Sequence, residues 1–225
     1  MNFYEELFLP ACQNNDLDRV KAFLKGLNVN VNTVSEDGQR SGITIAAKQN
    51  YIELLDLLLC QPGIDANLPT TESVSKSKKF GKWTPLMFAC RAGHHKIVRR
   101  LVQVPGINIT HKDSYGRTAL HVAALKGHSD CLEELAKVPG LDWNCRDSDW
   151  TPLFEALSHG RPDCVRIIVS QPGVDLSVKT HNGTTLTEIA VQSTRGDPVE
   201  CVKIMAEVAA VDWNVKMKNG DTPIM

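Results

Sequence analysis

The sequence lacks any apolar run long enough to cross a bilayer, which takes about 20 residues. It also lacks early basic charge, because the start, MNFYEELFLPACQNND, carries acids where a secretory signal peptide carries lysine or arginine. An excess of one charge is missing as well, since 25 lysines and arginines stand against 26 aspartates and glutamates. We therefore expect no membrane insertion and see no global reason for binding to nucleic acid.

Cysteines arranged for disulfides are absent too. The seven cysteines are an odd number, widely spread and without a C-x-x-C pair. Oxidised extracellular domains usually carry even numbers of cysteines at regular spacings. We expect reduced thiols and an intracellular protein, either cytoplasmic or nuclear.

The sequence also contains none of the common catalytic signatures. There is no G-x-S-x-G, P-loop, H-E-x-x-H or glycine-rich dinucleotide pattern, and the seven histidines are scattered. We expect no enzymatic activity in this segment, no cofactor and no small-molecule substrate.

What the sequence does contain is a pattern that recurs about every 33 residues. The segments WTPLMFACRAG, RTALHVAALKG and WTPLFEALSHG place Thr84, Thr118 and Thr151 at spacings of 34 and 33, and Thr184 follows 33 later. Ser41 opens a weaker copy. A Pro-Gly pair begins 21 residues after four of these anchors, at Pro62, Pro105, Pro139 and Pro172. Two independent markers at one constant offset indicate true internal repeats.

Each marker has a structural reason. A Thr or Ser hydroxyl accepts a hydrogen bond from a free backbone N–H at a helix start, and proline is tolerated at the next position. Nine residues later stand residues that accept a left-handed conformation and so end a helix, namely Asn15, Asn50, Gly93, Gly127 and Gly160. This predicts a short helix A, and paired apolar residues such as Leu54 and Leu55 predict a helix B after it. Such short helices are marginal alone and must stack on neighbours.

These segments resemble the ankyrin repeat family, most closely at RTALHVAALKGH, and the resemblance covers essentially the whole chain. It implies an all-α ankyrin-repeat solenoid of stacked helix-turn-helix units with projecting hairpin loops, which we term fingers. We expect a single domain over 1–225, with an N-terminal capping repeat. The expected repeats are 6–40, 41–83, 84–117, 118–150, 151–183 and 184–221, followed by the start of a truncated repeat at 222–225.

Two insertions interrupt the register. The first lies in the finger at 69–82, which is rich in serine and lysine. It is interpreted either as a solvated loop or as a basic finger, with Lys76, Lys78 and Lys79, for an acidic partner or for phosphorylation at its serines. The second, in STRGDPVECV, adds residues between the last two helices and is expected to be a tolerated surface loop.

In the ankyrin family, the partner usually contacts the concave face, which is formed by the fingers and the exposed side of helix A. Mapping those positions gives candidate partner-binding residues that are mostly aromatic or basic, so an acidic patch on a partner protein is expected. On the finger side they are Trp83, Tyr115, Arg117, Trp150 and His181. On the helix A side they are Lys48, Arg91, Lys126 and His159. Trp83 and Trp150 could equally pack between fingers as local core.

Several other residues have structural interpretations. Cys131, Cys164 and Cys201 share one repeat position, and stacked repeats hold such positions roughly 10 Å apart, too far for thiolates that must lie about 2.3 Å from zinc. We expect buried core residues there and no metal site. Trp143 and Trp213 fall in matching Asp-Trp-Asn segments. The family resemblance marks Asn67, Asn144 and Asn214 as positions that are hydroxylated in some members.

The leading functional hypothesis is a protein-interaction module or scaffold. The alternative is a regulatory or targeting arm of a larger multidomain enzyme, channel or adaptor, because Thr222-Pro223 opens a unit that is not completed. Binding of nucleic acid through the lysine-rich loop is a third hypothesis, which the near-neutral net charge disfavours.

Overall fold

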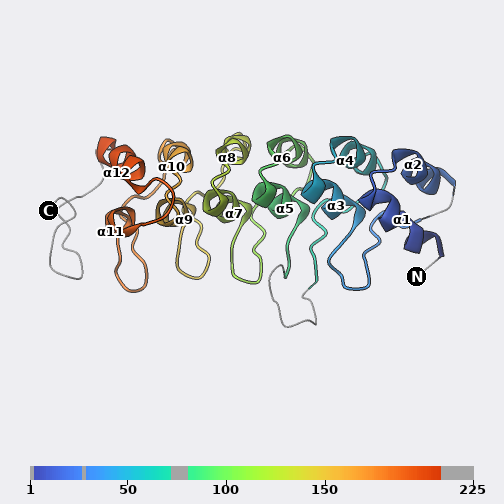
Figure 1. The fold of residues 1–225 in the computed structure, drawn as a ribbon, viewed down its shortest axis with the longest axis horizontal. Coiled ribbons are helices and arrows are strands. Elements are labelled where there is room, and N and C mark those ends of the chain that lie inside the picture. Colours follow the sequence, from blue (N-terminus) through green and yellow to red (C-terminus); the bar gives the residue numbers. More distant parts are fainter. Residues whose placement is uncertain (1–2, 27–28, 72–80, 209–225) are drawn as a thin grey trace. The chain divides into compact units, whose positions relative to one another are not determined.

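The computed structural model describes residues 3–26, 29–71 and 81–208. The chain divides into two compact units, Met1–Ser114 (unit 1) and Tyr115–Met225 (unit 2). Within each unit, short helices form two layers, and finger loops extend from the helix A layer (Figure 1). None of the described helices is long and apolar enough to span a bilayer. Lys76, Lys78, Lys79, Trp213, Asn214 and Thr222-Pro223 lie outside the described residues.

The described residues of unit 1 form three helix pairs. Helix A of each pair packs on the helix A of the next, α1 on α3 and α3 on α5, while α2, α4 and α6 form the second layer. Helix α1 begins three residues before Glu6, where the first repeat was expected to start. The helices are α1 (Phe3–Gln13), α2 (Leu17–Gly26), α3 (Gly42–Gln49), α4 (Ile52–Leu59), α5 (Pro85–Ala92) and α6 (His95–Val102).

Unit 2 repeats this arrangement. Helices α7, α9 and α11 pack in series, and α8, α10 and α12 pack behind them. The predicted all-α fold of stacked helix-turn-helix units with projecting fingers is thus confirmed within each unit. The helices are α7 (Ala119–Lys126), α8 (Ser129–Ala136), α9 (Pro152–Ser158), α10 (Pro162–Val169), α11 (Leu186–Gln192) and α12 (Pro198–Glu207).

The predicted helix starts are confirmed with one correction. Ser41 and Thr84 are extended N-caps whose hydroxyls accept from backbone N–H groups in the first turn. The last helix A is capped by Thr185 and not by Thr184. The Thr185 hydroxyl accepts from Glu188 N at 3.2 Å, and Glu188 Oε2 accepts from Thr185 N at 2.8 Å. This reciprocal capping box satisfies two free backbone donors at once, which Thr184 could not do.

The predicted helix ends are confirmed. Ser193, nine residues after Thr184, is extended, with φ of −64°. The five residues predicted to end helix A all have positive φ, between 53° at Asn15 and 80° at Gly127. This left-handed conformation turns the chain from helix A toward helix B.

The two helix layers enclose the apolar core. Leu54, Leu55 and Leu58 on α4 are completely buried, as are their counterparts on α6. Cys131, Cys164 and Cys201 are confirmed as core residues, with exposed fractions of at most 1%. Burial raises the pKa of Cys164 to about 12 and that of Cys201 to about 11, so these thiols stay protonated at neutral pH.

Asparagine side chains tie successive fingers together within each unit. In unit 1, Asn67 Nδ2 donates to Gly106 O at 2.9 Å, and Asn67 Oδ1 accepts from Asn108 N at 2.7 Å. In unit 2, Asn144 makes the matching pair of bonds to Gly173 O and Asp175 N. Both amide groups therefore have a structural role in the stack. Trp143, with an exposed fraction of 6%, is likewise part of the core.

Candidate partner-binding surface

In unit 1, a groove lies where the first finger tip meets the helix A layer. One cavity of about 270 Å³ is bounded by the tip at 37–40, by α3 including Lys48, and by Phe88 of α5. A second cavity of about 540 Å³ shares Asp37 and Arg40 with it and extends along α1. Lys48, an expected partner-binding residue, is exposed at the end of α3 and lines this groove.

Trp83 requires a correction. It was expected to offer its ring to a partner, but its exposed fraction is 3%. Its indole Nε1 donates to Asp113 Oδ2 at 3.0 Å, and its ring lies 5.4 Å from that of Phe88. The alternative, a local core between fingers, is therefore the correct interpretation. Arg91 is half-buried and places its guanidinium 5.8 Å from the Trp83 ring centre, so it covers this core.

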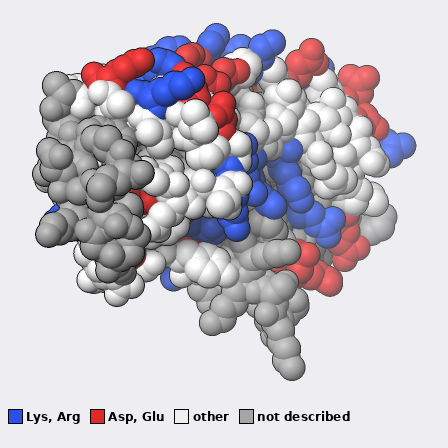
Figure 2. Space-filling view, turned by 60° about the vertical axis from the view of Figure 1, so that its left-hand side comes forward, with Lys and Arg blue, Asp and Glu red and all other residues white. Residues whose placement is uncertain are grey.

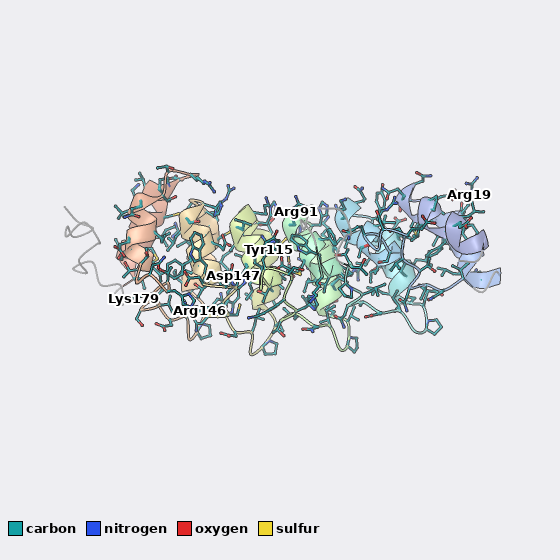
Figure 3. All side chains as sticks on the ribbon, turned by 90° about the horizontal axis from the view of Figure 1, so that it is seen from below. Arg19, Arg91, Tyr115, Arg146, Asp147 and Lys179 are labelled. Carbon is teal, nitrogen blue, oxygen red and sulfur yellow. The ribbon has the colours of Figure 1, made fainter. Side chains whose placement is uncertain are left out.

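In unit 2, Tyr115 and Arg117 form an exposed pair before α7. Tyr115 has an exposed fraction of 51%, and the Arg117 guanidinium lies 4.8 Å from its ring centre. Such stacking holds both side chains in place while their outer faces stay accessible. Figure 3 shows Tyr115 and, farther along the same unit, Arg146 and Lys179. The sequence named both residues as candidates, and Tyr115 is the most exposed aromatic (Phe, Tyr or Trp) side chain among the residues that the structure describes.

Trp150 is half-buried and fixed by its backbone. Its N–H donates to Asp147 Oδ1 at 2.9 Å, and its carbonyl oxygen lies 3.0 Å from His121 Nε2. His121 is completely buried and also accepts from Thr118 N at the start of α7, so its role is structural. Because Trp150 is only half-buried, part of its surface remains open to a partner.

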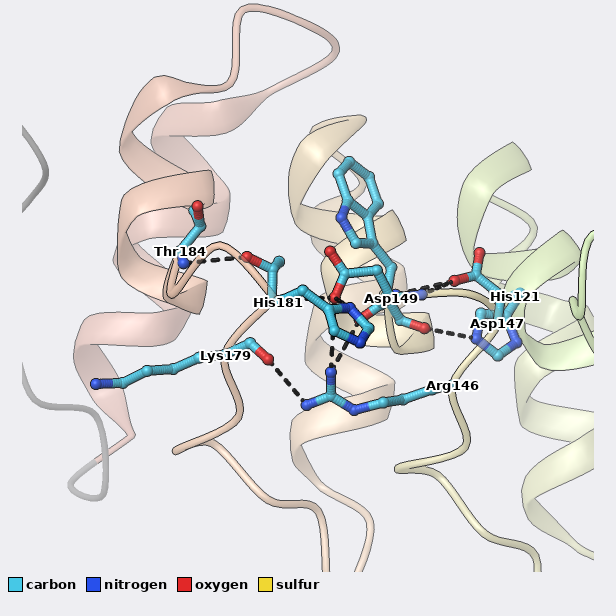
Figure 4. Close-up of polar contacts among 9 residues, drawn as sticks. His121, Arg146, Asp147, Asp149, Lys179, His181 and Thr184 are labelled. Carbon is cyan, nitrogen blue, oxygen red and sulfur yellow. Dashed lines mark hydrogen bonds and ion pairs between the residues drawn. The ribbon is translucent and has the colours of Figure 1, made fainter.

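Within unit 2, the tips of the two fingers that the structure describes are joined by a polar network that the sequence did not reveal (Figure 4). Arg146 donates to Asp149 O and to Lys179 O, both at 3.0 Å. Asp149 Oδ1 accepts from the ring of His181 at 2.6 Å and from its backbone N at 2.7 Å. Desolvation acts to raise the pKa of Asp149, but these bonds from His181 and the charge of Arg146 outweigh it and lower the pKa. His181 is thus held in a defined position although its side chain is 75% exposed.

Glu155 and His159 form a partly buried pair on α9 and its end. Glu155 is 7% exposed. Burial first and the charge of Asp147 second raise its pKa to about 7, against the opposing effect of Arg117. His159 Nδ1 lies 3.6 Å from Glu155 Oε2 and 3.0 Å from Glu155 O. Burial, followed by the charges of Arg195, Arg161 and Lys126, lowers the pKa of His159, although its bond to Glu155 O opposes this. The sequence pointed to His159 but not to Glu155.

The surface suits recognition through shape, aromatic faces and charge. Figure 2 shows groups of adjacent Lys and Arg side chains as well as areas where both signs alternate. Among the residues that the structure describes, no group of three or more His, Cys, Asp or Glu is placed to hold a metal ion.

Comparison with known proteins gives a consistent picture. A family model described as ankyrin repeats (3 copies) matches residues 43–147 and 103–180. The crystal structure of EF0377, an ankyrin repeat protein, matches 89% of this chain and 96% of its own length, with a TM-score of 0.75 and 27% sequence identity.

Two curated proteins share part of the sequence. The ankyrin repeat and KH domain-containing protein mask of Drosophila melanogaster is 33% identical over 101 residues, which cover 44% of this chain and 2% of that protein. The probable E3 ubiquitin-protein ligase XBOS32 of Oryza sativa subsp. japonica is 30% identical over 122 residues, which cover 53% of this chain and 22% of that protein. The match thus spans only a small part of either relative.

Proposed function

Because the chain belongs to the ankyrin repeat family, we propose that it holds a partner protein on the helix A and finger surfaces described above. Ankyrin repeats are generally protein–protein interaction modules. The function of such a module resides in the variable side chains of its surface and not in the fold itself.

The observation that carries this proposal is the Tyr115–Arg117 pair. Tyrosine and arginine are enriched among the residues that dominate binding energy. The stacked guanidinium and the fixed backbone of Trp150 order this surface before binding, so less conformational entropy is lost when a partner docks. His181 extends the same surface at the finger tips.

The proposed partner presents an acidic patch in an intracellular compartment. Lys48 and Lys126 are exposed, and Arg91 and Arg117 are half-exposed. The buried thiols of Cys164 and Cys201 suit a reducing cytoplasm or nucleus. The near-neutral net charge disfavours nucleic acid as the partner, and we propose no catalytic role for this segment.

Affinity capture from a cell lysate, followed by titration of the captured protein, tests the proposal. Tyr115→Ala and Arg117→Ala are each expected to weaken binding by about tenfold or more. Arg166→Ala, on the outer helix α10, removes the same charge from an exposed position in the second helix layer and serves as the control. Unchanged affinity in both Tyr115→Ala and Arg117→Ala would contradict the assignment. Substitution of Lys76, Lys78 and Lys79 by Gln tests the basic finger separately and leaves Thr70, which bonds to Trp83, intact.

A second candidate is a recognition arm within a larger protein. It is favoured because the repeats are a small part of both curated relatives, whose names describe a KH domain-containing protein and an E3 ubiquitin-protein ligase. Sequencing the natural transcript tests it. A reading frame that continues into a further domain would support this candidate, and a stop codon after Met225 would contradict it.

A further inference from the structure

The loop between α11 and α12, at 193–197, packs against the preceding repeat in a defined position. Ser193 Oγ donates to Ser158 O at 3.1 Å, and Asp197 N donates to Gly160 O at 3.0 Å. The approach requires glycine on both sides. A Cβ on Gly160 would lie 1.9 Å from Arg195 O, and one on Gly196 would lie 2.2 Å from Gly160 O. The inserted residues therefore form a fitted contact, which goes beyond the tolerated loop expected from the sequence.

The packing of this loop places Arg195 next to His159. The Arg195 Nη1 group donates to His159 Nε2 at 2.9 Å. The imidazole accepts this bond because its pKa is lowered, chiefly by burial, and the ring is neutral at neutral pH. The loop thus fixes a guanidinium at the end of α9, where a shorter connection would place none.

Two further cations lie beside it on the same unit. Arg161 stretches across the turn after α7, because a Cβ on Gly127 would lie 2.7 Å from Arg161 Cδ. The buried Arg161 Nε has no hydrogen-bond partner. Lys126 is exposed next to that turn. All three cations act electrostatically on His159.

Lys126, Arg161 and Arg195 form a cluster of positive charges that are not balanced by neighbouring acids. In the part of the chain that the structure describes, none of Lys126, Arg161 and Arg195 has an ion-pair partner. By contrast, Arg166 in the same unit pairs with Glu200 at 3.4 Å. One neighbouring acid, Asp197, is otherwise engaged, since it caps α12 by accepting from Glu200 N at 3.0 Å. Burial raises the pKa of Glu155 to about 7, so this carboxyl carries only a partial negative charge at neutral pH. Like charges held together without a counter-ion favour an external anion.

We propose that Lys126, Arg161 and Arg195 bind an extended acidic segment of the partner, with carboxylates spaced along its chain. This proposal rests on the proposed function of protein recognition and specifies its chemistry. The three cations come from three successive repeats, so they are distributed along unit 2 as carboxylates are along an extended peptide. A single phosphate would need them to converge on one point. Arginine suits this task because its planar fork can bind a carboxylate through two parallel hydrogen bonds.

The test is fluorescence anisotropy with a labelled peptide of alternating glutamate and glycine, titrated with the full chain. Arg161→Gln and Arg195→Gln are each expected to weaken binding about two- to fivefold, and the double variant more, with further loss as salt is added. Arg166→Gln is the matched control, because it removes the same charge from an exposed site outside the cluster. Circular dichroism of each variant verifies that the helices remain folded.

The outcomes separate this proposal from the proposed function. Equal loss in Arg166→Gln and in the cluster variants would show a general charge effect and overturn the assignment. Equal binding of a glutamine–glycine peptide, or binding only when one glutamate is replaced by phosphoserine, would also overturn it. If the captured partner depends on Tyr115 and Arg117 but not on Arg161 and Arg195, protein recognition stands and the acidic-segment site fails.

Discussion

Trp83 in unit 1 and Trp150 in unit 2 occupy the same repeat position, directly before an anchor threonine, yet their surroundings differ. Trp83 is buried and donates to Asp113, 30 residues later. Thirty residues after Trp150 stands Thr180, whose hydroxyl already accepts from Thr184 N at 3.0 Å within its own finger. Arg91 covers Trp83, while Ser158 occupies the corresponding position near Trp150. Whether this tryptophan joins the core is thus decided by the next finger.

The largest expected effect is on stability when the buried ring is removed. Trp83→Ala should lower the free energy of unfolding by about 3–5 kcal/mol, because it empties a packed site. Trp150→Ala should cost less than half of that, since its ring is partly solvated already. Urea denaturation followed by circular dichroism measures both. Equal losses would contradict the structural distinction between the two positions.

The next largest expected effect is a pH dependence of the free energy of unfolding. Only unit 2 should show it, because only there does the compared helix A position carry a titratable residue. Phe88 stands in unit 1 where Glu155 stands in unit 2. The folded-state pKa of Glu155, about 7, lies above the ordinary glutamate value of 4.5. The folded state therefore keeps a proton that the unfolded state loses, and the free energy of unfolding falls as pH rises through this window.

Glu155→Gln should remove about 1–3 kcal/mol of that fall between about pH 5 and about pH 7.5. Comparing urea midpoints of the two proteins across this range measures the difference. Parallel pH profiles would show that Glu155 is not responsible.

A smaller effect concerns the hydrogen bond that buries Trp83. Asp113→Ala leaves the indole N–H unpaired and should cost about 2 kcal/mol. Thr180→Ala, at the matching position of unit 2, removes only a bond within its own finger and should cost about 1 kcal/mol or less. Thermal unfolding of both variants checks the order, and a larger loss in Thr180→Ala would reverse the comparison.

The smallest expected effect on stability is at the inserted loop of unit 2. Gly196→Ala forces a side chain into a left-handed conformation, with φ of 62°, and into the Gly160 carbonyl, so we expect a cost of about 1–2 kcal/mol. Gly173→Ala has φ of 78° but open space around its Cβ, and it isolates the backbone strain. Only Gly196→Ala should also weaken binding of the acidic peptide, as Arg195→Gln does. Equal peptide binding by both glycine variants would argue against a fitted loop.

Much of the local structure could be predicted. The N-caps at Ser41 and Thr84 and the left-handed residues Asn50 and Gly93 follow from single-residue preferences that act within one turn. The shift from Thr184 to Thr185 was missed because the repeat spacing was applied rigidly. The capping-box glutamate three residues after Thr185 would have revealed it.

The candidate site was predicted only in part. Tyr115, Arg117 and Lys126 were correctly placed at exposed or half-exposed positions by their offset from an anchor. Arg146, Arg195 and Glu155 were missed, because their roles depend on residues one repeat away. A charged residue at a helix A position that is usually apolar would have been a usable signal for Glu155.

The sequence by itself determined where helices start and stop and which residues enter the core, because hydrogen-bond caps, left-handed turns and apolar periodicity act over a few residues. Tertiary structure alone decided that Trp83 is buried while Trp150 stays partly open. It also decided that Arg195 reaches His159 through a loop seated on Gly160. These outcomes depend on packing between successive repeats, where a partner about 30 residues distant determines which side chains remain available for binding.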